Sequence, residues 1–194
     1  MANHMTTDTI IITALASELD ASLLPIGVQI YYSGIGKLNA AMTTFKAIEH
    51  SRPRRILNFG TVGAVAPHAS GLIEIQRVVQ RDMIAEPLAP RGQVPFCARP
   101  YEYLSGSGQY TCGTGDSFVM AKDPWFATNN VDVVDMELFA IAAIAHDHNI
   151  AWRSFKYVTD HTNEDSGQDW QQKVRHGERL FLDLLKEVLS TAKA

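Results

Sequence analysis

The stretch that decides the fold is Val133-Val134-Asp135-Met136-Glu137-Leu138-Phe139-Ala140. Here a β-branched strand pattern gives way to the Ala/Ile-rich pattern of a buried helix. Asp135 and Glu137 therefore fall at the carboxyl end of a strand, where open α/β sheets bind their ligands. Taken alone, the stretch has a plainer interpretation, in which Asp135 caps the helix and Glu137 lies in its first turn. The rest of the chain has to decide between the two.

The composition is that of a soluble globular protein. The chain has 194 residues, a hydrophobic fraction of 46%, a charged fraction of 20% and a net charge of -4, which predict a single domain over residues 1–194. Without a basic stripe or an apolar run of the ~20 residues that span a bilayer, we expect neither a nucleic acid nor a membrane partner. Residues 1–8 lack the regions of a signal peptide and are expected to form a flexible tail. Cys97 and Cys112 suggest no disulfide framework or metal motif, which favours a reducing cytoplasm.

Apolar, β-branched runs recur along the chain, and helical patterns or loops separate them. The expected strands cover residues 9–14, 28–32, 54–59, 73–79, 109–112, 131–134 and 150–158. The alternating run 73–79 is typical of a strand near a sheet edge. Helices are expected to begin at Leu15, Asn39 and Leu138, and an amphipathic helix covers residues 169–189. These elements predict an α/β fold with a mixed, mostly parallel, twisted central sheet flanked by helices.

Polar side chains collect where the expected strands end. They are Glu18, Thr61, Asp116, Asp135, Glu137 and Asp160. Several carboxylates at one edge of a sheet suggest a site, because a buried and unpaired carboxylate is costly. No metal-ligand cluster, nucleophile elbow or Walker loop accompanies them. The pattern therefore indicates acid/base chemistry on a neutral or weakly charged ligand.

Short motifs containing these residues follow one another along the chain. They are Ala14-Leu15-Ala16-Ser17-Glu18, Ser33-Gly34-Ile35-Gly36-Lys37-Leu38-Asn39-Ala40-Ala41, Asn58-Phe59-Gly60-Thr61-Val62-Gly63-Ala64, Thr114-Gly115-Asp116-Ser117-Phe118-Val119, Asp135-Met136-Glu137 and Val158-Thr159-Asp160. In this order they resemble the nucleoside phosphorylase/nucleosidase superfamily, and most closely the bacterial methylthioadenosine/S-adenosylhomocysteine nucleosidases. The resemblance extends from about Ile10 to Val188 and implies the fold of that superfamily.

The resemblance also implies roles for the matching residues. Glu18 matches the glutamate that activates the attacking water, and Asp160 matches the acid that protonates the departing purine. Met136 and Glu137 match the pair that contacts the ribose hydroxyls. The other implied substrate contacts are Thr61 beside the anomeric carbon, Phe118 and Val119 at the base, and Gly63, Asp135 and Thr159. Neither a metal nor an organic cofactor is required for this reaction.

Water is favoured over phosphate as the second substrate. Phosphorolysis needs a site for a doubly charged anion, which arginines usually supply. The loop 14–21 has no arginine or lysine, and Asn58 precedes Phe59-Gly60-Thr61, as in the nucleosidases that the chain resembles. A purine nucleoside phosphorylase stays open as an alternative, because a neighbouring subunit could supply a basic residue from the loop 91–99. A nucleoside-binding protein without catalytic activity stays open as a further alternative.

The chain departs from the family pattern at several places. It is shorter than typical members of the family that it resembles, and the region between Met83 and Tyr110 is compressed and lacks a helix usually found there. Asp135 replaces the usual glutamate, and Lys156 stands where a nucleosidase usually has arginine. Methylthioadenosine, adenosylhomocysteine, 5′-deoxyadenosine, futalosine and plain purine nucleosides therefore all stay open as substrates. By the same resemblance we expect a homodimer.

Overall fold

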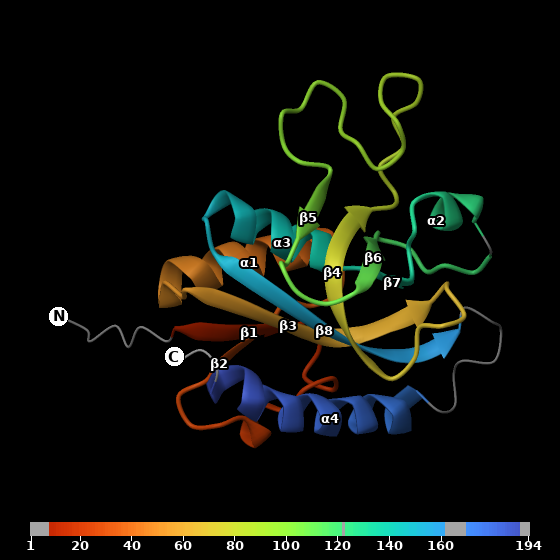
Figure 1. Cartoon of the computed structure of the whole chain (residues 1–194). Helices are drawn as coiled ribbons and strands as arrows, with labels where there is room; N and C mark the ends of the chain where they lie inside the picture. Colours follow the sequence, from red (N-terminus) through yellow and green to blue (C-terminus); the bar gives the residue numbers. More distant parts are fainter. Residues whose placement is uncertain (1–7, 122, 162–169, 191–194) are drawn as a thin grey trace.

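Figure 1 shows the computed structural model of the chain, which describes residues 8–121, 123–161 and 170–190. The expected tail lies outside this part except for Asp8, whose carbonyl accepts hydrogen bonds from the amides of Arg54 and Arg55. The elements, in chain order, are β1 (Thr9–Thr13), η1 (Ala21–Leu23), β2 (Gln29–Tyr32), α1 (Lys37–Ser51), β3 (Arg55–Ala64), β4 (Leu72–Gln80), β5 (Glu102–Leu104), β6 (Tyr110–Thr114), α2 (Pro124–Thr128), β7 (Val133–Asp135), α3 (Leu138–Asp147), β8 (Ala151–His161) and α4 (Trp170–Ser190).

The strands form one mixed sheet of eight strands. Parallel pairs join β1 to β2 and β3, β3 to β8, β4 to β6, and β6 to β7, whereas β3–β7, β4–β5 and β4–β8 are antiparallel. The predicted fold class, an α/β domain with a mixed and mostly parallel sheet, is confirmed. Because β8 pairs with both β3 and β4, the strands β3, β7, β6, β4 and β8 close into a ring, which the sequence did not indicate.

Helices cover the sheet on two sides. In Figure 1, α1 and α3 lie above it and α4 lies below it. The alternation of β1 sends Ile10 and Ile12 into the cluster under α1 and α3, and sends Ile11 into the cluster over α4. Both faces of β1 are therefore buried, which explains its continuous apolar run. On the α4 side, Phe59 stacks on Phe181 with the ring centroids 4.5 Å apart.

Two expectations about single elements are wrong. Leu15 opens no helix: a turn leads instead to the short 3₁₀ helix η1. Strand β3 does not end at Phe59 but runs through the glycine-containing segment to Ala64. Strand β4 was expected near a sheet edge and lies next to the last strand of the order, β5, while it also pairs with β6 and β8.

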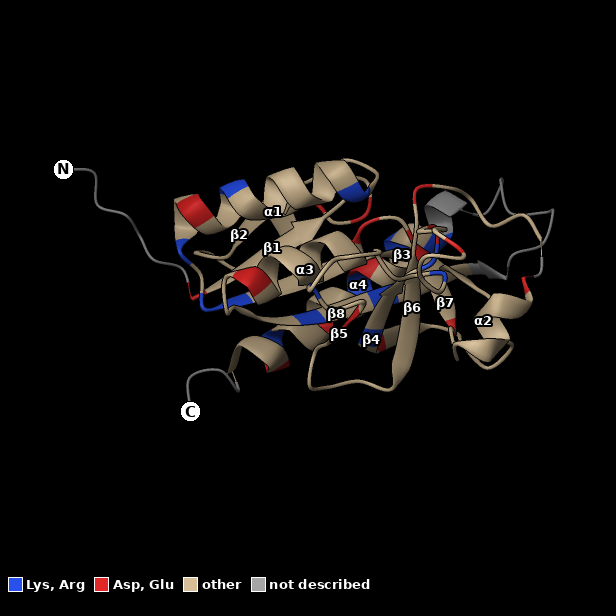
Figure 2. Cartoon of the chain, turned by 90° about the horizontal axis from the view of Figure 1, so that it is seen from above, with Lys and Arg blue, Asp and Glu red and all other residues tan. Residues whose placement is uncertain are grey.

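Residues 84–101 contain no helix, as the compressed sequence of this region suggested. They form a long loop that projects from the sheet in Figure 1 and leads to β5. Figure 2 shows Lys and Arg interspersed with Asp and Glu along the described elements. Among those elements, no helix has the length and apolar character needed to cross a membrane.

Candidate active site

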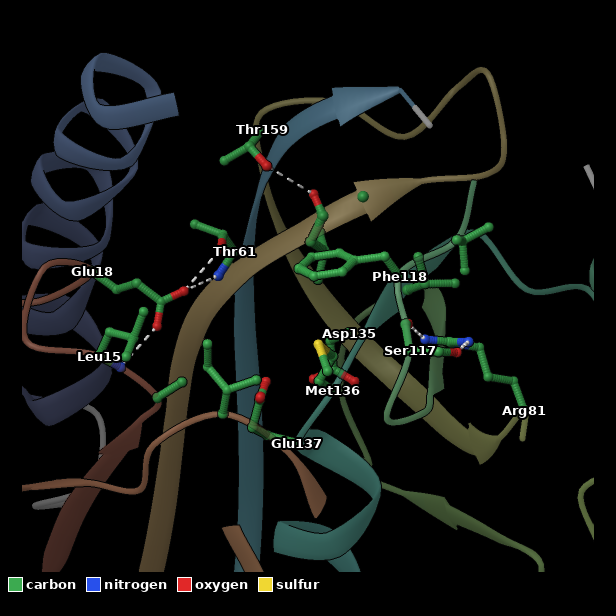
Figure 3. Close-up of a pocket in the computed structure, with 16 residues that line it drawn as sticks. Leu15, Glu18, Thr61, Arg81, Ser117, Phe118, Asp135, Met136, Glu137 and Thr159 are labelled. Carbon is green, nitrogen blue, oxygen red and sulfur yellow. Dashed lines mark hydrogen bonds between the residues drawn. The ribbon is translucent and has the colours of Figure 1, made fainter. Parts of the chain in front are cut away.

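A cavity of about 320 Å³ lies where the ends of several strands meet. The cavity is lined by Glu18, Thr61, Gly63, Phe118, Val119, Asp135, Met136, Glu137 and Thr159, all of which the sequence predicted as site residues. Asp116, the other strand-end acid whose side chain the structure describes, does not line the cavity and is half exposed. In Figure 3, the side chains of Glu18 and Thr61 lie on one side of the cavity and that of Phe118 lies on the other. The convergence of residues more than 100 positions apart in the chain contradicts the interpretation of Glu137 as a simple first-turn acid.

Glu18 forms one wall and is fixed by hydrogen bonds to both carboxylate oxygens. Its Oε1 accepts from the amide and the hydroxyl of Thr61 at 2.9 and 2.8 Å. Its Oε2 accepts from the amide of Leu15 at 3.1 Å and from the hydroxyl of Thr13 at 3.4 Å. The side chain is buried, with 4% of its surface exposed. These four donors hold the carboxylate in one orientation at the wall of the cavity.

Glu137 forms the opposite wall, at the start of α3. Its Oε1 accepts a hydrogen bond of 2.9 Å from the amide of Gly36, at the start of α1. Gly36 has a φ of 98°, which favours glycine and aims this amide at the carboxylate. Burial raises the pKa of Glu137 to about 7, and the nearby charge of Asp135 adds to the rise. Glu137 is thus partly protonated at neutral pH.

Two residues before Glu137, Asp135 forms a buried ion pair with Lys156. The Lys156 ammonium lies 2.9 Å from Asp135 Oδ2. Asp135 Oδ2 also accepts from the amide of Leu138 at 2.9 Å, and Oδ1 accepts from the Thr114 hydroxyl at 2.5 Å. Burial would raise the pKa of Asp135, but Lys156 and these hydrogen bonds outweigh it and lower the pKa below its usual value. Asp135 thus holds the first amide of α3 and lines the cavity, whereas the N-cap position, which the plainer interpretation gave to Asp135, is occupied by Glu137.

Phe118 and Val119 form the outer wall, in the segment that follows β6. Phe118 is 82% exposed and leans over the cavity in Figure 3. Thr159, on β8, is buried, and its hydroxyl donates to the carbonyl of Val62 at 3.4 Å. Asp160 follows it and stands opposite Gly63 in the register of β3 and β8. The side chain of Asp160, the predicted general acid, lies outside the described part of the structure.

Sequence reasoning missed one charged residue of this cavity. Arg81 follows β4 and lines the cavity although it is 5% exposed. It lies in no motif, and its partners are backbone carbonyls and Ser117, which no sequence pattern reveals. Lys156 was noticed only as a departure from a family pattern. No group of His, Cys, Asp and Glu among the described residues has the arrangement of a metal site.

Comparison with known protein families identifies the superfamily of this chain. A sequence model described as the phosphorylase superfamily matches residues 27–190. The chain belongs to the phosphorylase superfamily.

Within this superfamily, the chain is similar to several nucleosidases and to a hydrolase. The 5′-methylthioadenosine/S-adenosylhomocysteine nucleosidase of Geobacillus kaustophilus (strain HTA426) is 28% identical over 186 residues, which cover 83% of this chain and 78% of that protein. The structure of the S-adenosylhomocysteine nucleosidase of Streptococcus pyogenes, in complex with 5-methylthiotubericidin, superposes with a TM-score of 0.77 at 23% identity and covers 96% of this chain and 99% of that one. The futalosine hydrolase of Helicobacter pylori gives 0.81 at 17% identity and covers 95% and 100%. The two structures establish the shared fold.

The buried pair Lys156–Asp135 generates a stability prediction. We expect Lys156→Met to lower the free energy of unfolding by about 3–5 kcal/mol, because it leaves a buried carboxylate without its counterion. The double variant Lys156→Met/Asp135→Asn should be less destabilised than the sum of the two single variants, since both charges are then gone. Urea unfolding of all four proteins measures this coupling. Additive losses would show that the two groups do not stabilise each other.

The raised pKa of Glu137 generates a prediction about pH. Between its usual value of 4.5 and about 7, the folded chain binds more protons at this residue than the unfolded chain does. The contribution of Glu137 to stability therefore falls as the pH rises through this window, by at most about 1.4 kcal/mol per pH unit, and is level above it. The difference in unfolding free energy between the wild type and Glu137→Gln should follow this course. A difference that stays constant from pH 4 to 8 would contradict it.

Proposed function

We propose that the chain is a purine N-ribosyl hydrolase, a nucleosidase that cleaves the glycosidic bond of a methylthioadenosine- or adenosylhomocysteine-like nucleoside with water. The observation that carries the proposal is the pair of carboxylates, Glu18 and Glu137, held in one cavity by different backbone amides. Membership of the phosphorylase superfamily and the nucleosidase names of the relatives support it.

The base and the ribose have suitable walls in this cavity. A purine that stacks on the exposed ring of Phe118 would cover apolar surface on both partners. Glu137, partly protonated near neutral pH, can accept from or donate to a ribose hydroxyl. Met136 lines the cavity between these two walls and supplies an apolar contact for the sugar.

Cleavage of the glycosidic bond needs a general acid that protonates the purine and a general base that deprotonates the attacking water. A purine leaves poorly as an anion, so we assign Asp160 the role of protonating its five-membered ring as the bond to the sugar breaks. Such general acid catalysis contributes roughly 10²–10⁴-fold. Glu18, on the other side of the cavity, takes a proton from water while the water oxygen attacks the positively charged ribosyl carbon. The products are the free base and the ribose moiety.

The cations near the cavity favour water over phosphate. Arg81 is the only cationic residue among the described residues that line the cavity. Its guanidinium donates to the carbonyls of Gly113, Gly115 and Ser117. The ammonium of Lys156 is paired with Asp135. Binding a phosphate dianion would require these groups to leave their buried partners, which is costly.

The mechanism predicts a large loss of activity in Asp160→Asn. An amide cannot protonate the leaving base, so we expect base release to slow by about 10²–10⁴-fold. Release of free base should be measured on a panel of purine nucleosides, including methylthioadenosine and adenosylhomocysteine, with and without phosphate. Asp183→Asn, which changes an exposed acid on α4, is the matched control.

Each alternative predicts a different result in that assay. Unchanged base release by Asp160→Asn would refute the mechanism. A rate that rises with phosphate and yields ribose 1-phosphate would identify a phosphorylase. Tight binding of a nucleoside in calorimetry without any turnover would identify a binding protein.

We also propose that the enzyme is a homodimer that associates through α1. Leu38, Met42 and Phe45 recur at helical spacing on α1 and are 72%, 50% and 48% exposed. The stripe begins next to Ile35, which lines the cavity. A second copy of the chain on this apolar stripe would cover exposed apolar surface and close the side of the cavity.

A charge in this stripe should separate the subunits. We expect sedimentation to give a dimer for the wild type and a monomer for Phe45→Asp, because association would bury the new carboxylate. Leu23→Asp is the control, since Leu23 is also half exposed but belongs to η1. A monomeric wild type, or a Phe45→Asp variant that still dimerises, would rule out this interface.

A further inference from the structure

The outer wall of the cavity has little to hold its aromatic side chain in place. Phe118 is 82% exposed, so packing around the ring fixes it weakly. Its position depends instead on the backbone that precedes it, residues 115–117, which follow β6 and end at Ser117 in the lining of the cavity (Figure 3). What fixes that segment therefore also fixes Phe118.

Arg81 fixes this segment and the end of β6, because the nitrogens of its guanidinium donate hydrogen bonds to residues 113–117. Arg81 Nε donates to the carbonyl of Gly113 at 3.2 Å, and Nη2 donates to the carbonyl of Gly115 at 2.9 Å and to that of Ser117. Nη1 donates to the Ser117 hydroxyl at 3.1 Å. The side chain is 5% exposed, so these bonds form away from water. Only an arginine presents several donors in one plane in this way.

The backbone of the segment lies directly on the Arg81 side chain. A Cβ at Gly115 would come within 2.9 Å of both Cγ and Cζ of Arg81 and within 3.0 Å of Cγ of Asp82. Since Arg81 is tied to its carbonyl partners, it cannot move aside cheaply. A glycine is therefore required at position 115 for the backbone to lie against the Arg81 side chain. This packing restricts the position of the segment in addition to the hydrogen bonds.

The next residue, Asp82, extends the connection to the opposite wall. Its Oδ2 accepts from the amide of Asp116 at 2.8 Å, and its Oδ1 lies 2.5 Å from the ammonium of Lys37. The carboxylate of Asp116 in turn accepts from the amide of Lys37 at 2.7 Å. Lys37 follows Gly36, whose amide holds Glu137. One continuous network thus joins the segment under Phe118 to the turn that positions Glu137.

From this network we infer that Arg81 and Asp82 are positioning residues, which set the distance between the base-stacking ring of Phe118 and the ribose-binding carboxyl of Glu137. The inference rests on the proposed function, because it assigns these two groups to the two ends of one nucleoside. Arg81 acts on Phe118 through residues 113–117, and Asp82 connects this segment to the turn at Gly36. Neither residue takes part in proton transfer.

The role predicts a particular change in kinetics. If Arg81 only positions Phe118, Arg81→Met should raise the KM for methylthioadenosine about tenfold or more through lost stacking, while kcat changes less than about threefold. Free adenine should bind about tenfold more weakly, because it uses the base side alone. Arg77→Met is the matched control. Arg77 lies on the same strand β4 and is paired with Glu102 and the carbonyl of Asn129, outside the lining of the cavity.

A double-mutant cycle with Phe118→Ala separates positioning from general stability. Once the ring is absent, Arg81→Met has nothing left to position, so it should raise KM by less than about twofold further. If Arg81→Met does not fold, Asp82→Ala enters the same cycle, since Asp82 is partly exposed and its loss removes only the bonds to Lys37 and Asp116. For this variant, Asp82→Asn should restore part of the loss, because its amide oxygen still accepts from the amide of Asp116.

The outcomes distinguish this inference from the proposed function. A KM within about twofold of the wild type in Arg81→Met, or an effect that multiplies fully with that of Phe118→Ala, overturns the inference and leaves the hydrolase intact. If the wild type binds methylthioadenosine without cleaving it, the proposed function fails, and the same cycle is read from dissociation constants. If the wild type neither binds nor cleaves methylthioadenosine or adenine, both proposals are overturned.

Discussion

The site depends on one buried ion pair, between Lys156 of β8 and Asp135 at the end of β7. Asp135 also accepts a hydrogen bond from the amide of Leu138 and so fixes the start of α3, which Glu137 directly precedes. The same ammonium approaches the opposite wall: a Cβ at Gly60 would lie 3.3 Å from Lys156 Nζ and 3.6 Å from Glu18 Oε1. A single cation is thus placed among three carboxylates, and it limits the repulsion that would otherwise separate Glu18 from Glu137.

Backbone amides supply much of the remaining organisation. The amides of Thr61 and Leu15 donate hydrogen bonds to the carboxylate of Glu18. In the same way, the amide of Gly36 donates to Glu137 and that of Leu138 donates to Asp135. Amides fixed by strands and helix starts do not have to reorganise when a charged group changes its state, so each carboxyl keeps its place through a reaction cycle. The two acids of the cavity nevertheless differ in environment. Glu18 accepts hydrogen bonds from four donors, whereas Glu137 accepts one from the amide of Gly36 and has a raised pKa.

The sequence predicted the fold class and the cavity-lining acids because both follow from periodicity and from where strands end. It misjudged β3, since a glycine after a strand normally indicates a turn. Gly60 instead lies within the strand, where a side chain would crowd Lys156 and Glu18. It also missed Arg81, whose partners are mainly carbonyls from β6 and the segment after it. Contacts between side chains and distant backbone depend on the closed ring of strands, which local patterns do not encode.

The closure of the ring has a consequence for local stability along β8. Residues 154–157 pair with β4 on one side and β3 on the other, whereas residues 160–161, in the described structure, pair with β3 alone. Opening the end of the strand breaks fewer hydrogen bonds than opening its middle, so protection of its amides against solvent exchange decreases toward Asp160. The proposed acid therefore lies on the part of β8 that pairs with one strand, whereas Lys156, deeper in β8, is paired with a strand on each side.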